Sequence, residues 1–175
     1  MSGKIVGLVI LLSALCAGGA LYYLQIYGFY EDVTSEVAEV RLMSLAEEKP
    51  IAIRAENIQA IDADSSPIRF RGCFTTPSSL PMLTETYVGL NRAVPRNAPK
   101  WFDCFDAAAI AEELKAGTAL AFLSEKNVNF GVDRIVAVTE DGRGFIWHEL
   151  NDCGEKAYDG TIVGEECPDR KEANE

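Results

Sequence analysis

The first 30 residues divide into a short charged start, a long apolar run and an aromatic end. The apolar run covers residues 5–24 (IVGLVILLSALCAGGALYYL), 20 residues without a charged side chain. A helix of that length spans about 30 Å, the thickness of the hydrocarbon core of a bilayer. Because lipid offers no hydrogen-bond partners, such a segment must satisfy its own backbone groups as a helix. The pattern therefore predicts one transmembrane helix followed by a polar domain.

The residues on either side of the apolar run predict its orientation. Lys4 precedes the run, and the next charged side chains are the acids between Glu31 and Glu39. Positive charge is retained on the cytoplasmic side, so residues 1–4 are expected in the cytoplasm and residues 31–168 outside it. Four of the six tyrosines fall between residues 22 and 30. They predict an aromatic belt at the headgroup level, which makes residues 5–30 the anchor.

Two other interpretations of the apolar run have to be weighed. Residues 17–20 (AGGA) offer small side chains where a signal peptidase could cut. The apolar run continues past them through residues 21–24, which favours an uncleaved anchor, although the sequence does not decide the matter. A lipoprotein acylated at Cys16 is disfavoured, because the bulky Leu15 stands where a small residue is needed.

Beyond residue 30, alternating and periodic apolar positions predict the elements of one domain. The expected strands are residues 68–74, 120–123, 131–139 and 143–150, and the expected helices are residues 79–87 and 107–116. Asp106 and Gly117 are the cap and stop signals of the second helix. The Asp141-Gly142 pair is typical of a type I′ hairpin turn.

The order of these elements predicts the fold class. Strands and helices follow one another without a regular βαβ alternation, which favours an α+β domain with a largely antiparallel sheet and one or two helices. Residues 37–45 fit either a strand or a helix, and Pro50 is expected to break whatever precedes it. Residues 151–168 look like a loop, and residues 169–175 are expected to be a flexible tail.

Charge narrows the range of partners. The chain carries 27 acidic and 16 basic residues, and only Lys4 lies before the apolar run, so the polar domain has a net charge of −12. A surface that acidic argues against nucleic acid and against anionic lipid as partners of the domain. It suits a basic protein partner, or simply solubility. Lipid contact is expected only through residues 5–30.

Cysteine usage agrees with an exported domain. Besides Cys16 in the apolar run, the chain holds Cys73, Cys104, Cys153 and Cys167. An even number in an oxidising compartment favours two disulfides, with three possible connectivities. The pairs Cys73–Cys104 and Cys153–Cys167 are favoured because each lies within one neighbourhood of the chain. No Cys-x-x-Cys motif occurs, so neither a redox site nor a zinc ribbon is indicated, and no metal or cofactor is expected.

Candidate binding chemistry is limited to two arginines. Arg69 and Arg71 fall on one face of the expected strand 68–74, beside Thr75 and Thr76, where they could hold an anionic ligand. Neutralisation by neighbouring carboxylates is the competing interpretation.

No catalytic residue is predicted. His148 is the only histidine, and it falls in a predicted hairpin strand without a neighbouring nucleophile or a second histidine for zinc. A structural or exposed histidine is therefore expected, whose replacement by Gln costs no more than about 1 kcal/mol.

Several stretches together resemble an uncharacterised family of small bacterial proteins with a single membrane anchor. They are YYLQIYGFYE, IDADSSPIRFRGCFTT, LTETY, APKWFDCFDA, GVDRIVAV, DGRGFIWHELNDCGE and the final ECP. The resemblance implies no established activity, substrate or fold. Some members carry a histidine-kinase label, but a dimerising helix that bears the histidine and a Gly-rich ATP domain are both missing here.

Two function classes follow from these features. The first is a non-enzymatic accessory or assembly protein of an inner-membrane complex, with its domain in the periplasm and a membrane protein as partner. The alternative is a periplasmic sensing or ligand-binding domain centred on Arg69 and Arg71. A deep pocket that converges on these arginines would favour the alternative.

Overall fold

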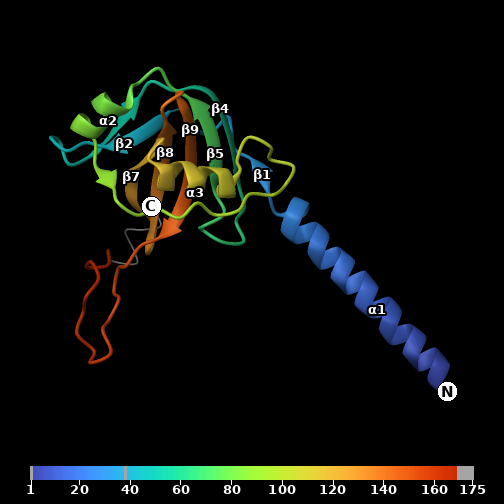
Figure 1. The fold of residues 1–175 in the computed structure, drawn as a ribbon. Coiled ribbons are helices and arrows are strands. Elements are labelled where there is room, and N and C mark those ends of the chain that lie inside the picture. The colour runs from blue at the N-terminus through green and yellow to red at the C-terminus, as the bar shows by residue number, and fades with distance from the viewer. Residues whose placement is uncertain (1, 38, 169–175) are drawn as a thin grey trace.

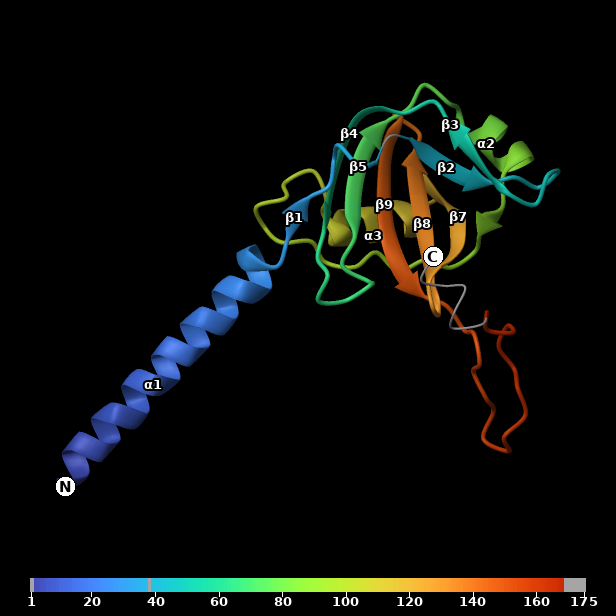
Figure 2. The same ribbon diagram turned by 180° about the vertical axis from the view of Figure 1, so that it is seen from behind.

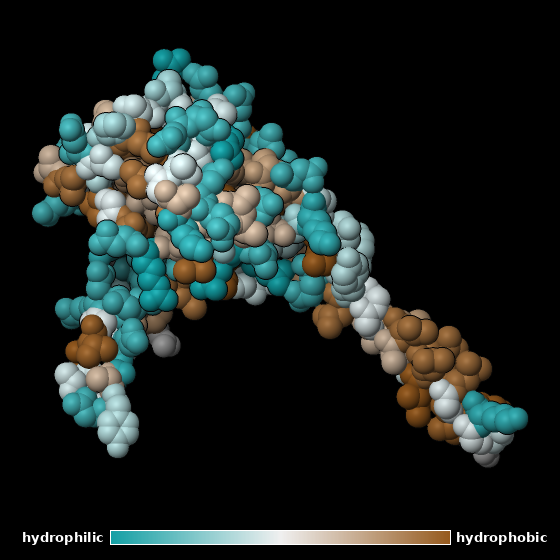
Figure 3. Space-filling view, in the orientation of Figure 1, coloured by the Kyte–Doolittle hydropathy of each residue, from teal (hydrophilic) through white to brown (hydrophobic). Residues whose placement is uncertain are grey.

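The computed structural model describes residues 2–37 and 39–168, and it begins with a long helix that stands away from the rest of the chain (Figure 1). Helix α1 covers Gly3–Tyr23 and continues as one π-helical turn, η1, over Leu24–Gly28. Together they form one helix long and apolar enough to cross a membrane. Its surface is almost continuously hydrophobic, whereas the surface of the domain is largely hydrophilic (Figure 3). The predicted helix is confirmed, and its length and composition are consistent with a single membrane span.

The domain is built on one antiparallel sheet of seven strands. In spatial order the strands are β1 (Glu31–Asp32), β4 (Glu56–Asp62), β5 (Arg71–Thr75), β9 (Arg143–Leu150), β8 (Val132–Thr139), β7 (Ala119–Asn129) and β6 (Gly89–Leu90). Every pairing within this sheet is antiparallel. With its helices the sheet makes an α+β domain, which confirms the predicted fold class.

A second, two-stranded sheet and a short helix cover one face of the large sheet. Strands β2 (Val40–Met43) and β3 (Pro50–Ile53) pair with each other, and helix α2 covers Leu80–Thr86. Their apolar side chains pack on those of the central strands in one buried cluster. Residues 40–43 therefore resolve the ambiguous segment 37–45 as a strand. Strand β2 ends at Met43, turn and bend residues 45–49 follow, and Pro50 begins β3, where the lost backbone donor is tolerated.

Helix α3 (Ala107–Ala116) covers the opposite face, crossing in front of the strands in Figure 1 and behind them in Figure 2. Asp106 accepts hydrogen bonds from the backbone N–H groups of Ala108 and Ala109 and so caps the helix as predicted. Gly117 ends it with a φ of 78°, a left-handed conformation that favours glycine. The second buried cluster, which includes Ile110 and Trp147, lies under this helix.

The hairpin between β8 and β9 forms where it is expected, but its turn differs in type. Three residues, 140–142, separate the two strands, and Val138 pairs with Gly144. A type I′ turn requires a positive φ at both central residues. Gly142 has a φ of 83°, whereas Asp141 has no positive φ, so the type I′ prediction is wrong. One left-handed glycine is sufficient in a three-residue hairpin loop.

Two element boundaries also differ from the sequence prediction. Strand β5 begins at Arg71 rather than at residue 68, because Pro67 O contacts His148 and Arg69 contacts Gln25, which keeps this stretch off the sheet. Strand β7 is longer than residues 120–123, since it pairs with β8 along its length. Ser79 stands at the start of α2 but makes no capping hydrogen bond with its side chain.

The chain after β9 leaves the sheet as an extended segment, visible in Figures 1 and 2. Residues 151–168 contain turns and one isolated bridge, between Lys156 and Ile162, but neither helix nor strand. The expected flexible tail, residues 169–175, lies outside the described residues.

Candidate functional site

Arg71, the first residue of β5, is buried beneath the loop that leads into α3. Its side chain is 4% exposed and makes four hydrogen bonds, all to backbone carbonyls. Nε donates to Arg96 O at 2.8 Å, Nη1 to Ile68 O and Phe70 O at 2.9 and 2.6 Å, and Nη2 to Asn97 O at 3.1 Å. Burial lowers the pKa of Arg71 to about 10. The guanidinium therefore holds the loop 96–97 against the sheet and has little capacity left for a ligand.

Arg69 has other hydrogen-bond partners than Arg71, because it contacts the end of the anchor. Nη1 donates to Gln25 O at 3.3 Å, and Nη2 donates to Gln25 Oε1. The guanidinium also lies over the ring of Tyr30, 5.6 Å from its centroid. Neither arginine forms an ion pair within residues 2–37 and 39–168. Direct neutralisation by a carboxylate, the competing sequence interpretation, is therefore not how these residues are satisfied.

Trp101 makes a second attachment between the domain and the anchor. Its Nε1–H donates to Ile26 O at 2.7 Å, and its ring meets that of Tyr30 edge-on with centroids 6.0 Å apart. The last carbonyls of a helix have no partner within the helix. Here side chains of the domain supply donors to two carbonyls of the π-helical turn, those of Gln25 and Ile26. We call these contacts of Arg69 and Trp101 with residues 25–30 the anchor joint.

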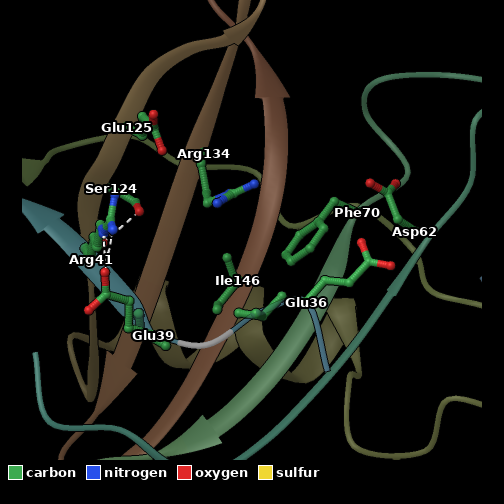
Figure 4. A pocket seen from close by; sticks show the side chains of 11 residues that line it. Glu36, Glu39, Arg41, Asp62, Phe70, Ser124, Glu125, Arg134 and Ile146 are labelled. Atoms are coloured by element: carbon green, nitrogen blue, oxygen red, sulfur yellow. Dashed lines mark hydrogen bonds and ion pairs between the residues drawn. The ribbon is translucent and has the colours of Figure 1, made fainter. Parts of the chain in front are cut away.

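A cleft lies on the face of the large sheet that β2 covers, between the start of β2 and the sheet (Figure 4). It has a volume of about 360 Å³. Arg134 and Phe70 form part of its wall, and the guanidinium of Arg134 lies 4.9 Å from the centroid of the Phe70 ring. The surrounding acids are Glu36, Glu39, Asp62 and Glu125.

His148 is buried behind this cleft, with 3% of its surface exposed. Its ring stacks on Phe70 at 4.8 Å, its Nδ1 lies 2.7 Å from Pro67 O, and its Nε2 accepts a hydrogen bond from Arg134 Nε at 3.1 Å. This arrangement places the proton on Nδ1, since a carbonyl can only accept. Burial first, and the charge of Arg134 second, lower the pKa of His148 to about 4. The imidazole is therefore neutral at neutral pH.

The cleft does not assemble a hydrolytic site around His148. Both ring nitrogens are engaged, and the hydroxyl of Ser124, which lines the cleft, donates to Arg41 O at 2.6 Å. Within the described residues no three His, Cys, Asp or Glu side chains are grouped to hold a metal ion. His148 is buried and hydrogen-bonded through both ring nitrogens, so the expectation of an exposed histidine is wrong.

The four cysteines of the domain lie in two pairs at disulfide distance. Cys73 in β5 pairs with Cys104 in the loop before α3, with Cα atoms 6.3 Å apart. Cys153 pairs with Cys167 in the segment after β9, with Cα atoms 4.8 Å apart. Cys16 in the anchor is free. The first pair fixes the loop that also carries Trp101.

The sequence interpretation singled out Arg69 and Arg71 but missed their partners. Trp101 has no predicted role, and Gln25 lies within the expected anchor, residues 5–30, without a role of its own. Arg134 stands in an alternating strand, where a single base gives no signal. A polar Gln25 directly after 20 uncharged residues was the only hint of a joint.

Comparison with known proteins gives a family and nothing beyond it. No curated protein matches the chain. No solved structure matches it either. One family model, described as a family of unknown function (DUF6446), matches residues 40–168, which includes almost the entire domain after the anchor. The chain therefore belongs to the family of unknown function DUF6446.

Proposed function

We propose that this protein is a non-enzymatic accessory protein of an inner-membrane assembly, anchored by α1 with its domain in the periplasm. The observation that carries the proposal is the anchor joint. A domain that only binds a soluble molecule could be joined to its anchor by a flexible linker. Here Arg69 and Trp101 bind the backbone of the anchor itself, which fixes the domain relative to the helix.

A fixed joint serves recognition of another membrane protein. A partner in the same bilayer can meet the protein only within a narrow range of heights and angles, so an orientation set in advance lowers the entropic cost of association. The helix offers lipid or a partner helix an exposed surface over its whole length. The acidic domain, with its net charge of −12, suits a partner whose facing surface is basic.

The arrangement around His148 supports a role without chemistry. A general base needs a free nitrogen and a pKa near the working pH. His148 has both nitrogens engaged and a pKa lowered to about 4.

The alternative, a ligand-binding domain centred on Arg69 and Arg71, receives less support. Four donors of Arg71 are used by backbone carbonyls, and Arg69 is held by Gln25. The two side chains border the same hollow, of about 460 Å³, but the hydrogen bonds that they make hold the joint and the loop before α3.

The experiment is purification of the tagged full chain in a mild detergent, followed by mass spectrometry of what accompanies it. We expect one membrane protein to be enriched with the native chain and depleted when Arg69→Gln and Trp101→Phe loosen the joint. Arg54→Gln is the matched control, because Arg54 is exposed and pairs with Glu56 away from the joint. Equal recovery of the partner with all variants would contradict the role of the joint, and recovery of no specific membrane protein would contradict the accessory role.

A further inference from the structure

Beside the anchor joint lies a hollow of about 460 Å³ whose lining contains no carboxylate. Gln25, Ile26 and Tyr30 of the anchor form one side. Arg69, Arg71 and Arg96 of the domain form the other. In a chain with 27 acids and 16 bases, a hollow lined by three arginines and no acid is a local reversal of charge. We call it the junction hollow.

The arginines of the junction hollow differ in what they can offer. Arg71 already uses four of its five N–H donors on backbone carbonyls, so it contributes mainly positive charge rather than hydrogen-bond donors. Arg96 is exposed, and only its backbone carbonyl takes part in the contact with Arg71. By contrast, five bases elsewhere in the described chain are ion-paired: Arg41, Lys49, Arg54, Lys126 and Arg143.

The position of the hollow decides what can reach it. Residues 25–30 follow directly on the 20 uncharged residues that match the hydrocarbon core, so the hollow lies at the level of the lipid headgroups. Ile26, Ile68 and Pro99 add an apolar part to its lining. An exposed guanidinium binds a phosphate oxygen well, and the apolar part suits the glycerol end of a lipid.

We propose that the junction hollow binds the phosphate of an anionic membrane phospholipid. Arg96 is the principal hydrogen-bond donor, and the charges of Arg69 and Arg71 make the electrostatic potential in the hollow more positive. This rests on the helix lying in a membrane, which is part of the proposed function, but it does not require a protein partner. The overall charge of −12 still disfavours anionic lipid over the rest of the domain.

A second hollow at the same level is a poorer candidate. It has a volume of about 920 Å³ and includes Lys100, but Asp103 and Asp106 line it as well. The two carboxylates offset the single ammonium group. The preference for an anionic lipid is therefore assigned to the junction hollow.

The test uses the full chain in nanodiscs of phosphatidylcholine and phosphatidylglycerol in equal amounts. The protein is then released into mild detergent, and the retained lipids are counted by native mass spectrometry. We expect phosphatidylglycerol to be retained in preference to phosphatidylcholine, and Arg96→Gln to reduce that preference about fivefold, the effect of one base near a membrane surface. Arg54→Gln, which removes the same charge from an exposed position outside the hollow, should leave it unchanged.

Three results would overturn the proposal: equal retention of both lipids by the native chain, equal loss of preference in Arg96→Gln and Arg54→Gln, or displacement of phosphatidylglycerol by excess inorganic phosphate. The last would show a site for free phosphate rather than for a lipid. If the native chain shows no lipid preference but still captures a membrane protein, this inference alone is overturned and the accessory role is retained.

Discussion

At the scale of single residues, burial decides what His148 and Arg71 can do. Both are polar side chains in the interior, and neither is hydrogen-bonded to a carboxylate among the described residues. Arg71 donates to backbone carbonyls, whereas His148 is hydrogen-bonded to the carbonyl of Pro67 and to the guanidinium of Arg134. An unsatisfied buried donor costs about 1–3 kcal/mol, so each of these hydrogen bonds is expensive to remove. The expectation that His148→Gln costs no more than about 1 kcal/mol assumed partial exposure, and it has to be raised to about 1–3 kcal/mol.

The pH dependence of unfolding follows from the same burial. The pKa of His148 is 6.5 in its ordinary state and about 4 in the fold, so only the unfolded chain binds a proton between these values. Its stabilising contribution is complete above pH 6.5 and is lost as the pH falls towards 4, by up to about 3 kcal/mol. We expect urea unfolding of the full chain in micelles, followed by tryptophan fluorescence, to show this decline.

His148→Gln provides the control for that measurement, because Gln does not titrate. The variant should be less stable at pH 7 but should lose less stability than the native chain between pH 6.5 and 4. Identical pH profiles for the two proteins would show that His148 is not held neutral by the fold.

At the scale of elements, the sequence predicts what local signals determine. Asp106 and Gly117 mark helix α3 correctly because capping acts over a few residues. The hairpin of β8 and β9 is found from its glycine, although the turn type is not. The start of β5 and the length of β7 depend on contacts with distant residues, such as Pro67 with His148, and therefore cannot be predicted from a local pattern.

The two helix caps offer a matched pair for a test. Asp106→Ala should lower the free energy of unfolding by about 1 kcal/mol, because it removes two hydrogen bonds to the backbone at the start of α3. Ser79→Ala should have a much smaller effect, since Ser79 makes no capping hydrogen bond at α2. Urea titration of both variants measures the difference, and an equal loss from both would refute this account of the caps.

At the scale of the whole molecule, the anchor and the domain meet through contacts that no local pattern could predict. Arg69 and Gln25 are 44 residues apart, and Trp101 and Ile26 are 75 residues apart. The sequence could identify Arg69 and Arg71 as unusual bases in an acidic chain. It could not show that Arg71 donates to Arg96 O and Asn97 O in the loop before α3, because that depends on where the loop lies in the fold.

Orientation in the membrane is also a property of the whole chain. With Lys4 before the helix and acids after it, we expect alkaline phosphatase fused after Glu175 to be active, which requires export. A reporter that works only in the cytoplasm should be inactive at the same position. Activity of the cytoplasmic reporter, with silence of the phosphatase, would reverse the topology and remove the periplasm from the proposed function.

The claim on which the account depends most is that the anchor joint fixes the domain to the helix. The free Cys16 in the anchor provides one site for a spin label, and Glu112→Cys on the exposed surface of α3 provides another. Pulsed electron paramagnetic resonance on the full chain in nanodiscs measures the distribution of distances between them. We predict a single narrow distribution, which broadens when Arg69→Gln and Trp101→Phe are introduced together. A broad distribution in the native chain, unchanged by those substitutions, would contradict the account.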